Sequence, residues 1–303
     1  MSMSDQPVLH SISCPDAAGG HRMAYWQWGD AAHPHVVVCA HGLSRQGRDF
    51  DVLARALCQR AGGALRVICP DVVGRGRSDW LRDPSGYQVP AYAADMLALL
   101  AHLHAQAPMG RLDWLGTSMG GLIGMVLAGQ PGLPLPVALR RLVLNDVGPD
   151  VQWVAIQRIA GYLGRVETFD SVQAAADLLW ARSTEFGPHT PQQWLELSRH
   201  MVRPASGGTL TLHYDPAIAV PLGAMTEASL QRDSATLWAL YDNINAQVLL
   251  LRGAQSDLLT RATAQAMTQR GPKATLIEFA GVGHAPTFVA ADQIDAVTHF
   301  LLD

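Results

Sequence analysis

The stretch that decides the fold is Leu112-Asp113-Trp114-Leu115-Gly116-Thr117-Ser118-Met119-Gly120-Gly121-Leu122. Residues 112–115 are predicted to form an apolar strand, and an apolar helix is predicted to begin at Ser118. Between them, residues 116–120 match the pattern G-x-S-x-G. In this context the pattern places a serine on a sharp strand-to-helix turn, and the flanking glycines leave room for its strained backbone. Ser118 is therefore the candidate nucleophile.

Short β-branched runs alternate with helical patterns on both sides of this stretch, an order typical of a parallel sheet covered by helices. The alternation stops at about residues 149–221, where helical segments follow one another, so we expect an inserted helical cap. The predicted domains are a first part of the core (1–149), the cap (150–222) and a second part of the core (223–303). Strands are predicted at 9–14, 22–28, 35–40, 65–69, 112–115, 142–145, 248–251 and 275–279, the first two as an antiparallel edge hairpin, and cap helices at 153–163, 171–182 and 191–201.

A serine hydroxyl becomes a good nucleophile only when a base removes its proton. The chain has twelve histidines, and His284 is distinguished by its position. It lies in the loop Gly281-Val282-Gly283-His284-Ala285-Pro286, between the last predicted strand and the last predicted helix. A side chain in such a loop reaches over the carboxyl ends of the strands, so His284 is the candidate general base.

A carboxylate must hold the histidine in the correct tautomer. Asp257 follows the predicted strand at 248–251. The order serine, acid, histidine along the chain is the one expected when the nucleophile lies on a strand-to-helix turn of a parallel sheet, and Ser118, Asp257 and His284 have that order. The rival is Asp146, which follows the preceding strand and would lie at the same edge of the sheet. We favour Asp257 as the catalytic acid and expect Asp146 to fix the entry to the cap through local hydrogen bonds.

Acyl transfer also requires hydrogen-bond donors for the oxyanion. The N–H of Met119, next to the nucleophile, is one candidate. The other is the N–H of Leu43 in the sequence His41-Gly42-Leu43-Ser44, directly after the predicted strand at 35–40. We expect His41 to be a structural residue that holds this loop.

Aromatic residues of the predicted cap are candidate walls of a substrate pocket for an apolar group. We select Trp153, Trp180 and Tyr214 as substrate-binding candidates, with Tyr162 and Trp194 as further possibilities. The alternative for each ring is that it packs the cap onto the core. Arg45 could meet a substrate carboxylate, but pairing with Asp49 is the expected arrangement.

The composition favours a small-molecule partner. Lys plus Arg (22) nearly balance Asp plus Glu (26), so the chain has no strong positive electrostatic field to attract nucleic acid or an anionic membrane.

The four cysteines form no C-x-x-C pair, and we expect them to be reduced. Without a signal-like start or a long apolar run, the expectation is a cytoplasmic protein. No cofactor or metal motif is present, and a homo-oligomer remains compatible with the sequence.

The motifs together resemble the α/β-hydrolase superfamily over nearly the whole chain. Residues 116–120 look like its nucleophile elbow, His41-Gly42 like its oxyanion loop, and residues 253–257 and 281–284 like its acid and base loops. Residues 71–78 are similar to the D-x-x-G-x-G-x-S turn of many members, which we interpret as scaffold. The resemblance implies an eight-stranded, mostly parallel sheet with a helical cap over the site. Epoxide hydrolases and haloalkane dehalogenases of this fold have aspartate at the elbow, so Ser118 disfavours both chemistries.

The function that follows is hydrolysis of a carboxylic ester of a small to medium, largely apolar substrate through an acyl-enzyme. Three alternatives remain open at this point. One is cleavage of C–C bonds in ring-opened dienoates, another is cofactor-free perhydrolase or haloperoxidase activity, and the last is a ligand receptor that turns over slowly.

Overall fold

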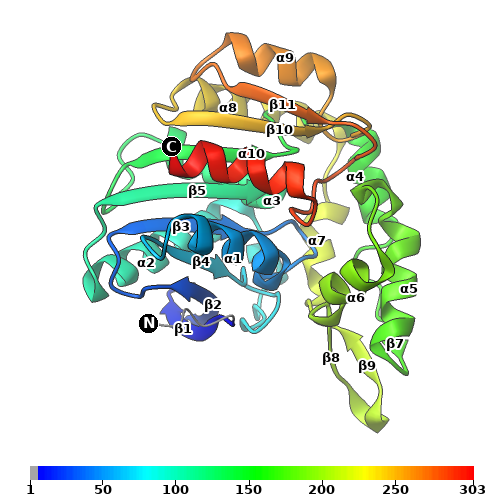
Figure 1. Cartoon of the computed structure of the whole chain (residues 1–303). Helices are drawn as coiled ribbons and strands as arrows, with labels where there is room; N and C mark the ends of the chain where they lie inside the picture. Colours follow the sequence, from blue (N-terminus) through cyan, green and yellow to red (C-terminus); the bar gives the residue numbers. More distant parts are fainter. Residues whose placement is uncertain (1–5) are drawn as a thin grey trace.

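The computed structural model describes residues 6–303, and its centre is an eight-stranded sheet in the order β1-β2-β4-β3-β5-β6-β10-β11 (Figure 1). The pairs β1·β2 and β2·β4 are antiparallel, and all other pairs are parallel. The predicted eight-stranded, mostly parallel sheet is therefore confirmed. The strands are β1 (Val8–Cys14), β2 (His21–Gly29), β3 (His35–Ala40), β4 (Arg66–Pro70), β5 (Arg111–Thr117), β6 (Leu139–Asn145), β10 (Gln247–Gly253) and β11 (Thr275–Phe279).

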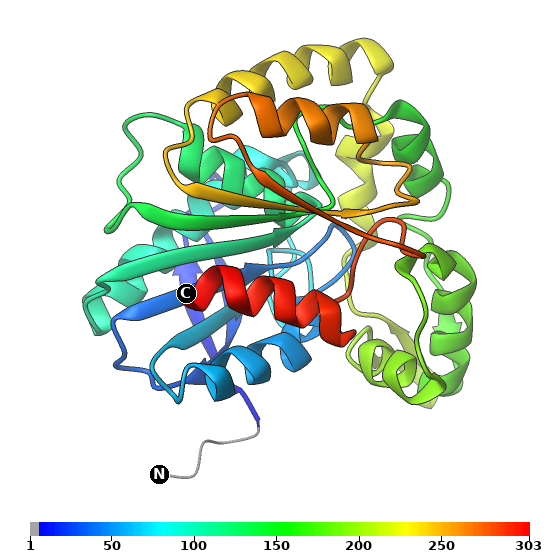
Figure 2. The same ribbon diagram turned by 45° about the horizontal axis from the view of Figure 1, so that its top comes forward.

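Helices cover both faces of this sheet, so its central strands are buried on both sides. All six residues of β3 are buried, which explains why residues 36–40 form a continuous apolar run rather than an alternating one. Two helices, α1 (Asp51–Arg60) and α10 (Ala291–Leu302), lie together on one face (Figures 1 and 2). The opposite face carries α2 (Val89–Gln106), α3 (Met119–Gly129), α8 (Glu227–Asp242) and α9 (Arg261–Gln269).

The segment between β6 and α8 leaves the sheet and lies beyond the carboxyl ends of its strands (Figure 1). Its helices are α4 (Trp153–Ala160), α5 (Val172–Arg182), α6 (Pro191–Arg199) and α7 (Ala219–Gly223). We call residues 150–226 the insert. The helices expected at 153–163, 171–182 and 191–201 correspond to α4, α5 and α6, while the division of the chain into domains stays a prediction.

The insert is not purely helical, which corrects the sequence expectation. It contains a three-stranded antiparallel sheet in the order β7 (Thr168–Phe169), β9 (Leu210–Leu212), β8 (Val202–Pro204). These strands have two or three residues each, too few to produce a period-two pattern in the sequence. Across residues 6–303, no helix is both long and apolar enough to cross a membrane.

Candidate functional site

Ser118 occupies the turn between β5 and α3 with a strained backbone, at φ 51° and ψ −114°. The turn brings the helix against the sheet so closely that the flanking residues must be glycine. A Cβ on Gly116 would lie 2.1 Å from the Gly120 carbonyl oxygen, and a Cβ on Gly120 would lie 2.1 Å from the Ala40 carbonyl oxygen. The G-x-S-x-G pattern is thus a packing requirement that leaves the serine side chain at the carboxyl end of the sheet.

His284 lies in the loop between β11 and α10 and faces this serine. Its Nε2 is 3.0 Å from the Ser118 Oγ, a hydrogen-bonding distance across 166 residues of sequence. Only 11% of the His284 side chain is exposed. The structure therefore brings together the two residues that the motif and the loop position selected.

The carboxylate that holds His284 belongs to Asp146. His284 Nδ1 lies 2.7 Å from Asp146 Oδ2, and the Asp146 side chain is fully buried at the end of β6. The N–H of Gly253 donates to Oδ1 (2.8 Å), and the Ser256 hydroxyl donates to Oδ2 (2.6 Å). The loop after β10 thus supplies two donors that fix the carboxylate, while β6 supplies the carboxylate itself.

The expectation that Asp257 holds His284 is wrong. The Asp257 carboxylate instead accepts two hydrogen bonds from Arg158 of α4, from Nε at 2.8 Å and from Nη2 at 2.9 Å, and its side chain is 39% exposed. The neighbouring strands β6 and β10 end at the same edge of the sheet. Both Asp146 and Asp257 also lie between Ser118 and His284 in the sequence, so chain order alone did not distinguish the two acids. Asp146 directly follows its strand, whereas Asp257 lies four residues past the end of β10, where the turn has reached the insert.

The predicted oxyanion loop is held by His41, which is fully buried. Its Nδ1–H donates to the Gly42 carbonyl oxygen (2.7 Å), and its Nε2 accepts from the Val72 N–H (3.0 Å). Desolvation lowers the pKa of His41 to about 3, so the ring is neutral and serves as a structural link. The Leu43 carbonyl is fixed by Arg75 Nε at 2.8 Å.

The two candidate oxyanion donors stay a prediction. Met119 is the first residue of α3, where a backbone N–H has no acceptor within the helix. Within residues 6–303, neither this N–H nor that of Leu43 donates a hydrogen bond to another protein group. Both amides are therefore free to serve an oxyanion.

A cavity of about 90 Å³ lies between the core and the insert, with Ser118 and His284 in its wall. Tyr214, one of the three selected aromatic residues, lines it, as does Tyr162. Trp153 and Trp180 are not among its lining residues, which corrects that expectation. The Trp180 ring packs edge-on against Trp194, with centroids 5.1 Å apart, so it joins α5 to α6 within the insert.

Three arginines also line the cavity, and each of them is paired with an acid. Arg45 donates to Asp49 through Nε (2.5 Å) and Nη2 (2.9 Å), the pairing expected from the sequence. Arg158 contacts Glu185 (2.7 Å) as well as Asp257, and Arg182 contacts Glu167 (2.5 Å). No spacing in the sequence distinguishes Arg158, Arg182 and Ser256 from ordinary helix and turn residues, so none of the three was predicted for the site.

Several known proteins that are similar to this chain in sequence or structure are hydrolases. The sequence model of the alpha/beta hydrolase family matches residues 37–297. The chain is 48% identical over 301 residues to the 3-hydroxybutyrate-oligomer hydrolase of Cupriavidus necator, covering 98% of this chain and 99% of that protein. It is 28% identical over 241 residues to the esterase Rv0045c of Mycobacterium tuberculosis, covering 77% and 70%. Among solved structures, an alpha/beta hydrolase from Novosphingobium aromaticivorans superposes with a TM-score of 0.81 at 34% identity, covering 98% of each chain.

These matches span almost the entire chain and include its predicted site loops. The predicted superfamily and the predicted enzyme class, an ester hydrolase, are confirmed at this level. The chain belongs to the alpha/beta hydrolase family.

Proposed function

We propose that the protein is a serine hydrolase that cleaves the ester bonds of 3-hydroxybutyrate oligomers through an acyl-enzyme. The observation that carries the proposal is the hydrogen-bonded chain from Ser118 Oγ through His284 to the buried Asp146 carboxylate. The substrate is suggested by the 48% identity to a 3-hydroxybutyrate-oligomer hydrolase over nearly the full length of both proteins.

In the first half of the reaction, Ser118 Oγ attacks the ester carbonyl while His284 Nε2 takes its proton. The buried Asp146 carboxylate stabilises the resulting imidazolium through the 2.7 Å contact with Nδ1. The oxyanion accepts hydrogen bonds from the N–H groups of Leu43 and Met119, each worth about 3 kcal/mol in the transition state. When the tetrahedral intermediate collapses, His284 returns the proton to the departing hydroxyl end of the next repeat.

In the second half, water replaces the alcohol. His284 removes a proton from the water, which attacks the acyl-enzyme carbonyl, and the same two amides stabilise the second oxyanion. Collapse of this intermediate gives the proton back to Ser118 Oγ and releases a free 3-hydroxybutyrate or shorter oligomer. No group beyond the protein and water is required for this cycle.

The cavity wall favours an uncharged polyester segment. Leu179, Ile159 and Tyr214 contribute apolar surface from the insert, which acts as a cap over Ser118 in this proposal. Because the lining arginines are all paired with acids, they have little attraction left for a substrate carboxylate. The wall therefore suits the neutral ester repeats of an oligomer better than a carboxylate group.

The proposal is tested with purified protein and the linear trimer of 3-hydroxybutyrate, with products separated by chromatography. We expect monomer and dimer from the wild type, and a loss on the order of a million-fold in kcat for Ser118→Ala. A fluorophosphonate probe should label the wild type and not this variant. The matched control is Ser183→Ala, because Ser183 also lines the cavity and has no assigned role.

Two results would contradict different parts of the proposal. Trimer cleavage by Ser118→Ala at the wild-type rate would exclude Ser118 as nucleophile. Rapid hydrolysis of p-nitrophenyl esters without cleavage of the trimer would keep the mechanism and reject the substrate.

A further inference from the structure

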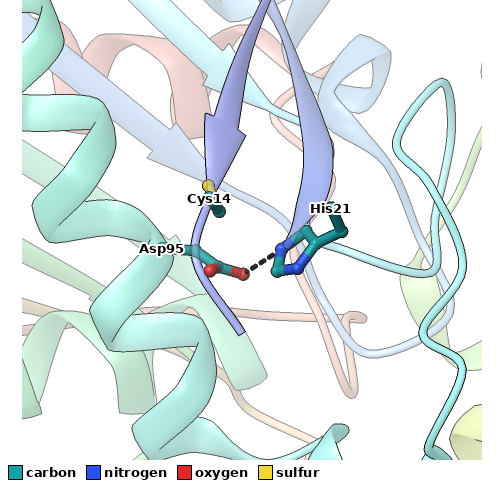
Figure 3. Close-up of side chains that lie close together, drawn as sticks. All are labelled: Cys14, His21 and Asp95. Atoms are coloured by element: carbon teal, nitrogen blue, oxygen red, sulfur yellow. Dashed lines mark hydrogen bonds and ion pairs between the residues drawn. The ribbon is translucent and has the colours of Figure 1, made fainter. Parts of the chain in front are cut away.

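A second group of chemically active side chains lies at the edge of the sheet, outside the cavity. Cys14 ends β1, His21 begins β2, and the two residues face each other as direct partners across the antiparallel hairpin. Asp95 of α2 approaches from the adjacent helix, and Figure 3 shows its carboxylate directed at the His21 ring beside the Cys14 sulfur. A thiol, an imidazole and a carboxylate from three elements thus converge on one point.

The group is compact and shielded from solvent. One ligand atom from each of the three residues lies within 4.8 Å of the other two, and His21 Nε2 is 3.1 Å from Asp95 Oδ2. Cys14 is 1% exposed and Asp95 3% exposed. Sulfur, imidazole nitrogen and carboxylate oxygen form a donor set that suits zinc.

A fourth residue fixes the orientation of the histidine. Asp16, in the turn of the hairpin, lies with Oδ2 2.9 Å from His21 Nδ1. Its other oxygen is held by the N–H groups of Ala18 (2.7 Å) and Gly20 (2.8 Å). Nε2 of His21 is therefore directed towards Cys14 and Asp95. Metal-binding histidines are usually oriented by a carboxylate on the other ring nitrogen in this way.

We propose that Cys14, His21 and Asp95 bind a zinc ion, with water as the fourth ligand and Asp16 as the residue that positions His21. Zinc lies about 2.3 Å from sulfur and about 2.0 Å from nitrogen and oxygen, so tetrahedral ligands are separated by roughly 3.2–3.8 Å. The 3.1 Å contact between His21 and Asp95 already approaches this spacing. A small rotation of the side chains completes the site.

The group has the same net charge with and without the metal ion. Without metal, an imidazolium lies between two carboxylates beside a neutral thiol. The hydrogen bonds that His21 makes with Asp95, Cys14 and Asp16 raise its pKa to about 11, and burial raises the pKa of the Cys14 thiol. Zinc replaces one proton from each of these two groups, so two protons are released and the net charge is unchanged. The ion would link the hairpin to α2.

The test uses the full chain, stripped of metal with a chelator and titrated with Co²⁺ in place of Zn²⁺. A tetrahedral site with one thiolate ligand gives intense visible d–d bands and a thiolate-to-cobalt charge-transfer band. We expect both bands to saturate at one Co²⁺ per chain and to disappear when Zn²⁺ is added. Zn²⁺ should also raise the melting temperature of the stripped protein.

Three variants separate the site from other metal binding. Cys14→Ser should remove the charge-transfer band, and Asp16→Asn should weaken Zn²⁺ binding about 10- to 100-fold without removing a ligand. The control His299→Gln removes an exposed histidine far along the chain and should leave the spectrum unchanged. If the wild type shows only weak octahedral cobalt bands, or if Cys14→Ser leaves the charge-transfer band in place, the group is an ion pair alone and the proposal is wrong.

Discussion

At the scale of single residues, Asp146 is the most constrained group of the site. Its carboxylate is fully buried and receives hydrogen bonds from His284, Ser256 and the Gly253 N–H. A buried carboxylate is costly unless its oxygens are hydrogen-bonded, and here both oxygens have donors. Asp257 has a different environment, because its side chain is 39% exposed and its carboxylate accepts two hydrogen bonds from Arg158.

The two acids should therefore respond differently to the same change. Asp146→Asn is expected to lower kcat about 10⁴-fold, since an amide cannot hold His284 in the tautomer that accepts the Ser118 proton. Asp257→Asn is expected to lower kcat less than about tenfold, because only its pairing with Arg158 is lost. Steady-state kinetics on a soluble ester measure both, and a larger loss for Asp257→Asn would restore Asp257 as the catalytic acid.

We expect Ser256 to be a positioning residue that acts through Asp146. Its hydroxyl donates to Oδ2 at 2.6 Å, and hydrogen bonds to charged groups contribute about 1.5–3 kcal/mol. Ser256→Ala should therefore lower kcat on the order of tenfold to a hundredfold while KM stays nearly constant. Ser256→Thr keeps the hydroxyl and should recover most of the activity. Equal losses for Ala and Thr would point to a distorted loop instead of a lost hydrogen bond.

At the scale of elements, His21 links the β1–β2 hairpin to α2 through its contact with Asp95. In the metal-free protein, His21 lies between the Asp95 and Asp16 carboxylates, whose hydrogen bonds raise its pKa to about 11. The folded state holds the proton more tightly than the unfolded state, where the pKa is about 6.5. The stabilisation is therefore fully present below about pH 6.5 and is lost as the pH rises through the folded pKa.

The corresponding measurement compares melting temperatures of the wild type and His21→Gln in the presence of a chelator. We expect the wild type to melt well above the variant at about pH 6 and the gap to narrow steadily towards about pH 10. Because Cys14 also loses its proton in alkaline solution, Cys14→Ser is the control that should keep this slope. A gap that stays constant or widens with pH would show that His21 does not carry a proton between the two aspartates.

At the scale of the whole molecule, the cavity exists because the insert lies against the carboxyl ends of the strands. Arg158 of α4 connects the two parts, since it contacts Asp257 of the core loop after β10 and Glu185 of the insert. These three charged side chains lie about one-third exposed beside the wall that Ser118 and Tyr214 share. We expect these contacts to hold the insert over the site.

A double-mutant cycle tests that connection. Arg158→Gln and Asp257→Asn should each raise KM for the oligomer several-fold with little change in kcat, because the wall of the cavity loosens while the reacting groups stay in place. The double variant should be no worse than the single ones, with a coupling energy of about 0.5–1 kcal/mol for a partly exposed pair. Strictly additive effects would show that the two residues act separately.

A feature could be predicted from the sequence when the residues that define it lie close together in the chain. The strand, the glycine spacing and the helix around Ser118 lie within nineteen consecutive residues, 111–129, so the elbow was predicted with its residues. His284 was found through its loop between the last strand and the last helix. Trp180 was misjudged, because an aromatic ring in a helix looks the same in sequence whether it faces a cavity or a neighbouring ring. The short strands β7, β8 and β9 left no periodic pattern at all.

The sequence by itself determined the family, the mostly parallel sheet, the serine and the histidine, because each of these follows from patterns within one strand, turn or helix. Only the tertiary structure decided which acid serves His284. Two aspartates follow adjacent parallel strands at the same edge of the sheet, and the choice depends on where each loop turns after its strand ends. The loop after β6 buries Asp146 among hydrogen-bond donors that include Ser256 and His284. The loop after β10 places Asp257 beside Arg158 of the insert. Such differences arise from contacts across 99 to 138 residues of chain, which no local pattern records.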